Sequence, residues 1–407
     1  MLAIPFFKYK ISHQQLFMLS ALLVNAGNYA YNLILGRILG PEAFADAAIL
    51  ITLLLVLSFA AMTFQLGTAR FVVLMQEQEQ AVFMKQIKKW GLRIGFFLGA
   101  VFVVFSSFFQ VIFQTQSQAM FIVFGLSVPL YFVMSINRGV FQGKQDMLSL
   151  AKTYQIEMWS RLLLTVLLLL IFYKQPAIGV AIGVGLSLIL AQFPKNRSQK
   201  ASGKLDKELN KEVLYFFLIT AFYEGTQILI NNSDILMVKH YFDAREAGLY
   251  ASLALIGRVV YFVAWMFVMI LLPVVVEKKK NGEDTRKILF KYVGYISILS
   301  AIVIGACFVA PQLLITLMFG KAYAEVAHLL GPYALATGMF AIANLFTYYF
   351  LSLKKYTSVF ISFVGGFLQI GLITFFHTDL LQVVSAQIVS MILLLIAQIL
   401  FFIKTEH

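Results

Sequence analysis

The chain has 407 residues, of which 60% are hydrophobic and 13% are charged. Soluble domains average about 25% charged residues, so this composition excludes a water-soluble globular protein and requires the bilayer as solvent. The formal net charge of +13 does not indicate nucleic acid, because Lys and Arg lie in short segments between apolar runs, where they face anionic lipid. One cysteine and five scattered histidines offer no disulfide within the chain and no metal-ligand spacing, so we expect neither a metal nor a cofactor.

Apolar runs long enough to cross a hydrocarbon core of about 30 Å, which takes about 20 residues each, recur along the whole chain. Because backbone groups in lipid must hydrogen-bond within their own segment, we predict that each run is a helix. The first six predicted spans are 15–39, 44–73, 91–113, 117–137, 148–173 and 176–193. The other six are 213–238, 247–275, 292–318, 327–352, 356–376 and 381–403.

The distribution of basic residues orients these spans. With the N-terminus in the cytoplasm, the outward segments carry few cations, namely Arg37, Lys174, Lys239, Arg245 and Lys321. Three arginines lie within or near the edge of the spans: Arg70, Arg161 and Arg258. All other Lys and Arg residues fall on inward segments, so we predict a multi-pass protein with both termini in the cytoplasm.

A polar stretch at 195–212 divides the chain into six spans before it and six after it. Two segments at corresponding places, 38–50 and 241–253, share a short outward turn, an acidic residue and an immediate return into lipid. Two parallel repeats around a cavity are a common transporter plan. We therefore predict an all-α polytopic membrane protein of about 12 helices, in two six-helix bundles related by pseudo-two-fold symmetry. The bundles comprise residues 1–194 and 213–407, and a cytoplasmic linker at 195–212 joins them.

Two segments resemble polysaccharide flippases (Wzx-like proteins) of the multidrug/oligosaccharidyl-lipid/polysaccharide superfamily: NLILGRILGPEAFADAAIL at 32–50 and DILMVKHYFDAREAGLYASLALIGRVV at 234–260. The first resembles the family's turn after helix one, except that Ala45 replaces the usual glycine after the aromatic residue. The second resembles the family's Asp-led helix seven and Arg-bearing helix eight. The resemblance implies a V-shaped pair of six-helix bundles and alternating access. It also implies export of sugars carried on undecaprenyl pyrophosphate across the bacterial cytoplasmic membrane.

Arg258 and Arg37 are the predicted phosphate-binding residues. A charge inside the hydrocarbon costs about 2.5–3.5 kcal/mol on insertion scales, so a charge that is kept there usually serves a function. Guanidinium groups bind phosphate oxygens bidentately, which suits a pyrophosphate in a wet cavity. Two alternatives stay open: a structural ion pair of Arg258 with Glu224 or Asp234, and an interfacial anchor for Arg37.

Glu157 and Arg161 lie four residues apart in the predicted fifth helix, so they share a face and can pair. Mutual neutralisation is the favoured interpretation of this pair. The alternative is ion coupling, with Glu157 as the proton-carrying group.

A polar stripe at three- and four-residue spacing runs along the predicted seventh helix, and the first helix carries a matching one. Such stripes cannot face lipid, so they line a cavity or hydrogen-bond to neighbouring helices. Because amides and carboxylates suit sugar hydroxyls, we favour substrate contact over interhelical bonding. The predicted contact residues are Asn28, Asn32, Glu224, Gln227, Asn231 and Asp234.

These features predict a flippase that moves undecaprenyl-pyrophosphate-linked oligosaccharide across the membrane for surface polysaccharide biosynthesis. Its predicted partners are lipid-linked oligosaccharide, membrane lipids and polysaccharide assembly proteins, with no nucleic acid.

A cation-coupled multidrug exporter of the same superfamily is the first alternative, since Glu224 and Asp234 supply acidic groups. A polytopic glycan-modifying enzyme is the second, but the sequence has no sizeable loop and no paired catalytic constellation, so we predict that the chain is not an enzyme.

Overall fold

The computed structural model describes residues 13–194, 203, 205–261, 264, 271, 275, 278–279, 281–353 and 355–406. In these residues every regular element is a helix, and none is a strand. Eight of the described helices are long and apolar enough to cross a membrane. A ninth span is obtained when the bent pair α2 (Glu77–Val104) and α3 (Ser106–Ile112), which meet at 64°, counts as one. The predicted all-α polytopic membrane fold is therefore confirmed.

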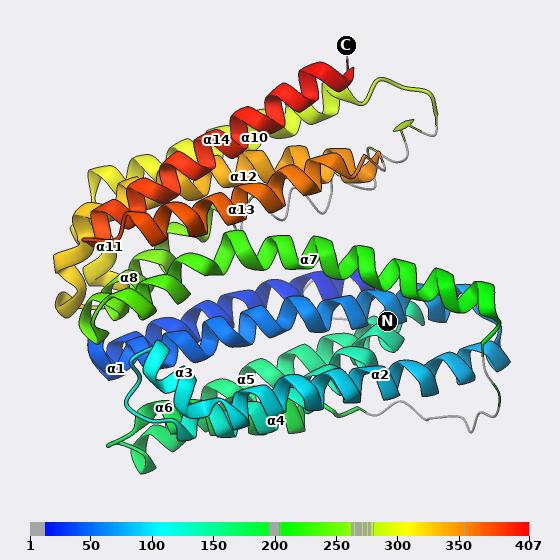
Figure 1. Cartoon of the computed structure of the whole chain (residues 1–407), viewed down its shortest axis with the longest axis horizontal. Helices are drawn as coiled ribbons and strands as arrows, with labels where there is room; N and C mark the ends of the chain where they lie inside the picture. The colour runs from blue at the N-terminus through cyan, green and yellow to red at the C-terminus, as the bar shows by residue number, and fades with distance from the viewer. Residues whose placement is uncertain are drawn as a thin grey trace, which may run out of the picture. The chain divides into compact units, whose positions relative to one another are not determined.

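Over its described residues, every predicted span coincides with helix (Figure 1). The first two lie in α1 (His13–Leu74), and the third corresponds to α2 with α3. The remaining elements are α4 (Ala119–Gly143), α5 (Met147–Ile171), α6 (Pro176–Leu190), α7 (Lys207–Tyr241), α8 (Ala244–Gly257), α10 (Arg286–Val309), α11 (Pro311–Met318), the 3-10 helix η1 (Lys321–Leu329), α12 (Leu330–Ser352), α13 (Thr357–Phe375) and α14 (Leu380–Glu406). Part of the predicted span 247–275 and residues 195–202 and 204 of the predicted linker lie outside the described residues.

A break at Gly40 separates the two spans within α1. Gly40 has φ 72° and ψ 173°, a conformation that glycine adopts readily because it has no Cβ. Pro41 follows and suits the first position of the second helix, since proline has no N–H to leave unsatisfied. The break therefore gives the short turn that the sequence predicts between the first two spans.

The exposed surface is apolar in a way that a water-soluble protein does not tolerate. Phe97, Leu170 and Ile302 are 68%, 76% and 64% exposed, whereas Asp234 and Thr226 are fully buried. Apolar side chains that project outward match hydrocarbon as the surrounding solvent, and polar groups avoid lipid by facing other helices. The arrangement of side chains thus agrees with the composition.

Contacts divide the chain into two compact units. Unit 1 comprises the residues up to Leu35 together with Asp46–Gly225. Within it α2 contacts α4, and α6 contacts both α4 and α5. A Cβ atom on Gly99 would lie 2.5 Å from the carbonyl oxygen of Gly125, so α2 and α4 approach to backbone contact. Small residues permit such tight packing, which stabilises helix pairs in lipid.

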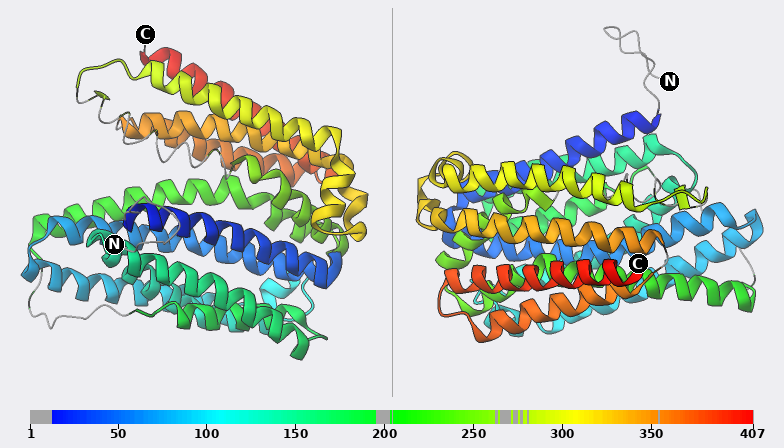
Figure 2. Two further views of the ribbon diagram at one scale, coloured as in Figure 1. Left: turned by 180° about the vertical axis from the view of Figure 1, so that it is seen from behind. Right: turned by 90° about the horizontal axis from the view of Figure 1, so that it is seen from above.

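Unit 2 comprises Gly36–Ala45 and Thr226–His407. Its central helix is α12, which contacts α8, α10, α13 and α14. Tyr349 and Phe350 of α12 form an apolar core with Leu289 of α10 and Phe402 of α14. Figure 2 shows α10, α12 and α14 running side by side in two views. The contact boundary between the units lies in α7 after Gly225, whereas the predicted boundary at 195–212 rests on the pattern of spans and stays a prediction.

Candidate functional site

A charged cluster lies inside unit 2, where α7, α8 and α12 meet. Arg258, which follows the last residue of α8, donates from Nη2 to Oδ1 of Asp234 at 2.6 Å. The Tyr333 hydroxyl donates to Oδ2 of Asp234 at 2.8 Å and accepts from Nε of Arg258 at 3.0 Å. The Tyr250 hydroxyl also donates to Oδ2, at 3.2 Å. We call these four residues the Asp234 cluster; it holds one cation and one anion and is neutral overall.

Gly257 explains how Arg258 reaches this place. A Cβ atom on Gly257 would lie 2.3 Å from the Tyr333 ring, so only glycine lets α8 pack this closely on α12. Asp234 is fully buried and Arg258 is 9% exposed. A buried charge needs a partner with good hydrogen-bond geometry, and here each charge is the other's partner. Of the alternatives for Arg258, the ion pair with Asp234 is observed, and the one with Glu224 is not.

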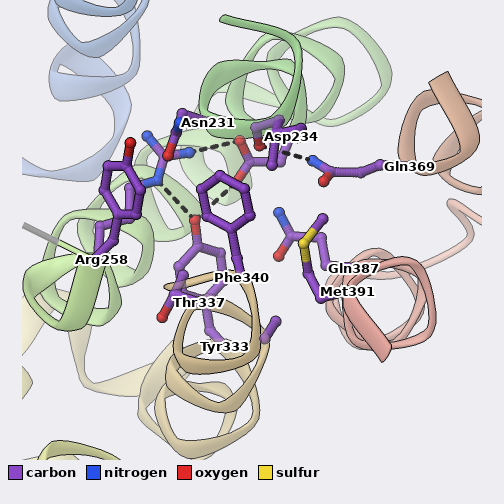
Figure 3. Close-up of a pocket in the computed structure, with 12 residues that line it drawn as sticks. Asn231, Asp234, Arg258, Tyr333, Thr337, Phe340, Gln369, Gln387 and Met391 are labelled. Carbon is purple, nitrogen blue, oxygen red and sulfur yellow. Dashed lines mark hydrogen bonds and ion pairs between the residues drawn. The ribbon is translucent and has the colours of Figure 1, made fainter. Parts of the chain in front are cut away.

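A pocket opens beside the Asp234 cluster (Figure 3). It contains about 330 Å³ of space including its mouth, and its enclosed part has room for about one water molecule. Arg258 and Asn231 lie on one side of it, and Gln369 of α13 and Gln387 of α14 reach it from the other. The remaining lining residues are Ile230, Asp234, Tyr261, Tyr333, Ala336, Thr337, Phe340 and Met391.

The pocket presents hydrogen-bonding capacity that the described protein does not use. The Oε1 atoms of Gln369 and Gln387 are buried without a described hydrogen-bond partner. No described residue accepts a hydrogen bond from Nη1 of Arg258. The pocket therefore offers one cationic donor edge and two amide acceptors to a polar ligand or to water.

A second charged cluster lies inside unit 1, between α4 and α5. Glu157 accepts from Nη2 of Arg138 at 2.7 Å and from Nη1 of Arg161 at 3.2 Å. Arg138 also donates to Oγ1 and the carbonyl oxygen of Thr153, at 3.1 and 3.0 Å, and lies over the Tyr154 ring at 3.7 Å. We call Arg138, Glu157 and Arg161 the Glu157 cluster. All three are less than 9% exposed, and with Glu157 ionised they carry a net charge of +1.

The Glu157 cluster reaches the predicted polar stripe of α1. Nη2 of Arg161 donates to Oδ1 of Asn28. Asn32 donates from Nδ2 to the carbonyl oxygen of Asn28 at 2.9 Å. The guanidinium of Arg161 lies 5.5 Å from the centre of the Tyr31 ring, and its Nε is buried with no partner in the described part of the chain. Asn28 is therefore linked to a surplus cation as well as to its own helix.

The predicted stripe of α7 is divided between two environments. Gln227 is 2% exposed, donates to Oδ1 of Asn344 at 3.3 Å and accepts from the Tyr261 hydroxyl at 3.2 Å, so it joins helices. Asn231 lines the pocket and donates to the carbonyl oxygen of Gln227. Glu224 belongs to unit 1, is 8% exposed, and has no hydrogen bond or ion pair with any described residue.

Arg37 lies apart from the pocket, on the exposed side of unit 2. Its guanidinium donates to the carbonyl oxygens of Met318, at 2.9 Å, and Leu317, which end α11. A cation at the C-terminus of a helix satisfies its last carbonyl groups and interacts favourably with its dipole. The described contacts of Arg37 are those of a helix cap.

Sequence reasoning missed Arg138 and the two pocket glutamines. The predicted span ends at residue 137 and so places Arg138 on an inward loop, whereas α4 continues to Gly143. The apolar pair Val140 and Phe141 beyond it was the available signal that the helix continues. Gln369 and Gln387 carried no signal, since a single amide in an apolar helix usually bonds to a neighbouring helix. No group of three or more His, Cys, Asp or Glu residues in the described part of the chain could hold a metal ion.

Comparisons with known proteins identify a family by sequence and a fold by structure. A family model described as "Polysaccharide biosynthesis protein" matches residues 34–328. No curated protein sequence matches the chain. An inward-facing multidrug resistance transporter of the MATE family in the MOP superfamily has a TM-score of 0.76 at 12% identity, with 94% of this chain and 96% of that chain covered. The lipid II flippase MurJ has a TM-score of 0.75 at 14% identity, with 96% of this chain and 87% of that one covered. A MOP superfamily transporter from Pyrococcus furiosus has a TM-score of 0.58 at 13% identity, with 96% and 94% covered. Identities this low show a shared fold.

Proposed function

The chain belongs to the polysaccharide biosynthesis protein family, and we propose that it is a flippase for undecaprenyl-pyrophosphate-linked oligosaccharide. The family match, the MOP transporter fold and the composition together support a membrane transporter. One protein with the same fold is a flippase for lipid II, which is itself a lipid-linked molecule. The proposed reaction is movement of the head group across the bacterial cytoplasmic membrane by alternating access, for surface polysaccharide biosynthesis.

The observation that carries this proposal is a guanidinium group next to unsatisfied amides inside an apolar helical unit. Nη1 of Arg258 is free of described partners and lies at the same pocket as Asn231, Gln369 and Gln387. Phosphate oxygens accept from guanidinium, and sugar hydroxyls exchange hydrogen bonds with amides. Charged and polar groups inside an apolar helical unit cost free energy, so groups that are kept there usually serve a function.

The residues divide into proposed substrate contacts and supporting residues. Arg258 contacts the phosphate, and Asn28, Asn32 and Asn231 contact sugar hydroxyls. Asp234 holds Arg258 in place, since its carboxylate accepts from that guanidinium at 2.6 Å. The contacts described for Arg37 and Gln227 support structural roles, as a helix cap and an interhelical bridge.

The proposal also covers the membrane topology of the chain and its partner proteins. The N-terminal and C-terminal halves, 1–194 and 213–407, are the two moving bodies, and both chain ends lie in the cytoplasm, as the positive-inside distribution favours. The substrate's lipid tail stays in the bilayer during transfer. Polysaccharide assembly proteins on either side of the membrane supply the substrate and consume the product.

Arg258→Gln tests the proposal, but alone it leaves Asp234 without a counter-charge. The better variant is Arg258→Gln combined with Asp234→Asn, which keeps the cluster neutral and folded. We expect transfer of lipid-linked glycan in proteoliposomes to fall by about tenfold or more in the double variant, because a charge-assisted contact is lost. Arg245→Gln, at an exposed ion pair of the same unit, is the matched control. Transfer at the wild-type rate by a folded double variant would show that Arg258 does not contact substrate.

A cation-coupled multidrug exporter is the second candidate, and Glu224 is the observation that favours it. Its carboxylate is buried in α7 and no described residue pairs with it. Such a carboxylate suits binding of a proton or a cationic drug. Drug-resistance assays in cells that express Glu224→Gln or the wild-type chain distinguish the candidates, because a polysaccharide flippase confers no resistance in either form.

A further inference from the structure

The charges of the Glu157 cluster do not balance. One carboxylate serves two guanidinium groups, and the exposed fractions of all three side chains are 10% or less. An uncompensated charge in a low-dielectric interior is strongly unfavourable, whereas a balanced pair can be tolerated. The Glu157 cluster therefore carries a surplus cation for which no second described carboxylate forms an ion pair.

The surplus lies on Arg161 and not on Arg138. Arg138 is fully engaged, since it donates to Thr153 and to Glu157 and covers the Tyr154 ring at 3.7 Å. Arg161 shares the same carboxylate at the longer distance of 3.2 Å. Its other partner, the Asn28 amide, is neutral, and its Nε donor is buried without an acceptor.

The position of Arg161 suits recognition of an oxyanion. Guanidinium donors form short, charge-assisted hydrogen bonds with phosphate and carboxylate oxygens. Nη2 of Arg161 donates to Oδ1 of Asn28, so the Nδ2 amide group of the same side chain lies next to the cation. The packing of α1 on α5 here is close, because a Cβ atom on Gly27 would lie 2.4 Å from the sulfur of Met158. Charge and amide are thus held together by the two helices of one unit.

We propose that Arg161, with Asn28, binds an oxyanion of the transported head group, either a phosphate or the carboxylate of an acidic sugar. Arg138 is a positioning residue, because it neutralises Glu157 and so leaves the charge of Arg161 available. This inference rests on the proposed function and adds to it a second anion contact, in unit 1, independent of Arg258 in unit 2. It also replaces ion coupling as the role of the Glu157–Arg161 pair.

The test measures binding of inorganic pyrophosphate and of glucuronate to the purified full chain by calorimetry at constant ionic strength. Three variants change the charge of the cluster in known directions: Arg161→Gln and Arg138→Gln make it neutral, and Glu157→Gln raises it to +2. Arg245→Gln, at an exposed pair with Glu325, is the matched control. Size-exclusion profiles establish that each variant is folded.

We expect affinity to follow charge, in the order Glu157→Gln, wild type, Arg138→Gln, with Arg161→Gln weaker than wild type by about tenfold or more. A folding defect gives no such order, because Glu157→Gln and Arg138→Gln each break the same ion pair but shift affinity in opposite directions. Arg161→Lys keeps the charge without the planar fork and is expected to fall between wild type and Arg161→Gln. If the wild-type chain binds pyrophosphate more tightly than glucuronate, the ligand group is a phosphate. If it binds glucuronate more tightly, the ligand group is the carboxylate of an acidic sugar.

Two outcomes overturn the inference: wild-type affinity for both probes in Arg161→Gln, or shifts in the same direction for Glu157→Gln and Arg138→Gln. Failure of the inference is separable from failure of the proposed function. If only the inference fails, the Arg258→Gln/Asp234→Asn variant still loses glycan transfer while the unit 1 variants keep it. If the proposed function fails, no variant in either unit changes glycan transfer.

Discussion

The Asp234 cluster of unit 2 and the Glu157 cluster of unit 1 are built from the same parts but are balanced differently. Each places a carboxylate between helices, with arginine and tyrosine around it. In unit 2 one guanidinium and two tyrosine hydroxyls converge on Asp234, and the charges cancel. In unit 1 two guanidinium groups share Glu157, so one positive charge is left over.

The difference shows that burial and residue type do not by themselves determine what an intramembrane arginine does. Arg258 and Arg138 are 9% and 4% exposed, and both donate to a buried carboxylate. Removal of Arg258 strands a carboxylate, whereas removal of Arg138 leaves a balanced pair of Glu157 and Arg161. The number of charges in a cluster therefore predicts how much stability is lost when one of its arginines is removed, and whether a surplus cation remains.

The largest effect is expected from Asp234→Asn. The substitution leaves Arg258 without a counter-charge in a neutral interior and weakens hydrogen bonds from two tyrosines, which costs about 3–5 kcal/mol. The measurement is the free energy of unfolding in detergent, supported by the yield of monodisperse protein. Glu325→Gln, at an exposed pair with Arg245, should change it by less than about 1 kcal/mol. Equal stability of the two variants would contradict a structural role for the buried pair.

The contrast between Arg258→Gln and Arg138→Gln is the next largest effect. Arg258→Gln isolates the fully buried Asp234 and should cost about 3 kcal/mol or more. Arg138→Gln loses hydrogen bonds to Thr153 and Glu157, but Arg161 remains to neutralise the carboxylate, so about 1–2 kcal/mol is expected. Unfolding of both variants under identical conditions compares them directly. If Arg138→Gln proves as costly as Arg258→Gln, the surplus charge of unit 1 is not available.

The spans could be predicted from the sequence because hydropathy over a bilayer's thickness depends on composition alone. The Arg258–Asp234 pair was within reach as an alternative, since both residues stand out in apolar runs. The excess of arginine around Glu157 was not, because Arg138 approaches from another helix and only packing brings it to 2.7 Å. Similarly, a stripe predicts that Gln227 and Asn231 face away from lipid, but not that one bonds to Asn344 while the other lines a pocket.

A smaller effect sharpens the account of the Asp234 cluster. Tyr333→Phe removes the hydroxyl that donates to Asp234 at 2.8 Å and accepts from Arg258 at 3.0 Å. The ion pair itself remains, so we expect a loss of about 1–1.5 kcal/mol in the free energy of unfolding. Tyr250→Phe, whose hydroxyl makes the longer contact of 3.2 Å, should cost less. A double-mutant cycle with the Arg258→Gln/Asp234→Asn pair measures the coupling, and zero coupling would exclude Tyr333 from the cluster.

The smallest effect is expected on the glutamine side of the pocket, where the side chains are neutral and two amide oxygens have no described hydrogen-bond partner. Gln387 is 5% exposed and no described residue hydrogen-bonds to its Oε1, so Gln387→Leu removes a polar group without breaking a protein contact. The free energy of unfolding should change by less than about 0.5 kcal/mol, or rise slightly, because a buried acceptor without a partner is itself unfavourable.

Gln398 of the same helix is the matched control, since its amide donates to Thr347, Ser358 and Ser362. Gln398→Leu should therefore cost about 1–3 kcal/mol. A comparable loss in Gln387→Leu would mean that water or a ligand satisfies the pocket amides, and unit 2 would then hold a polar occupant of its own beside its balanced pair.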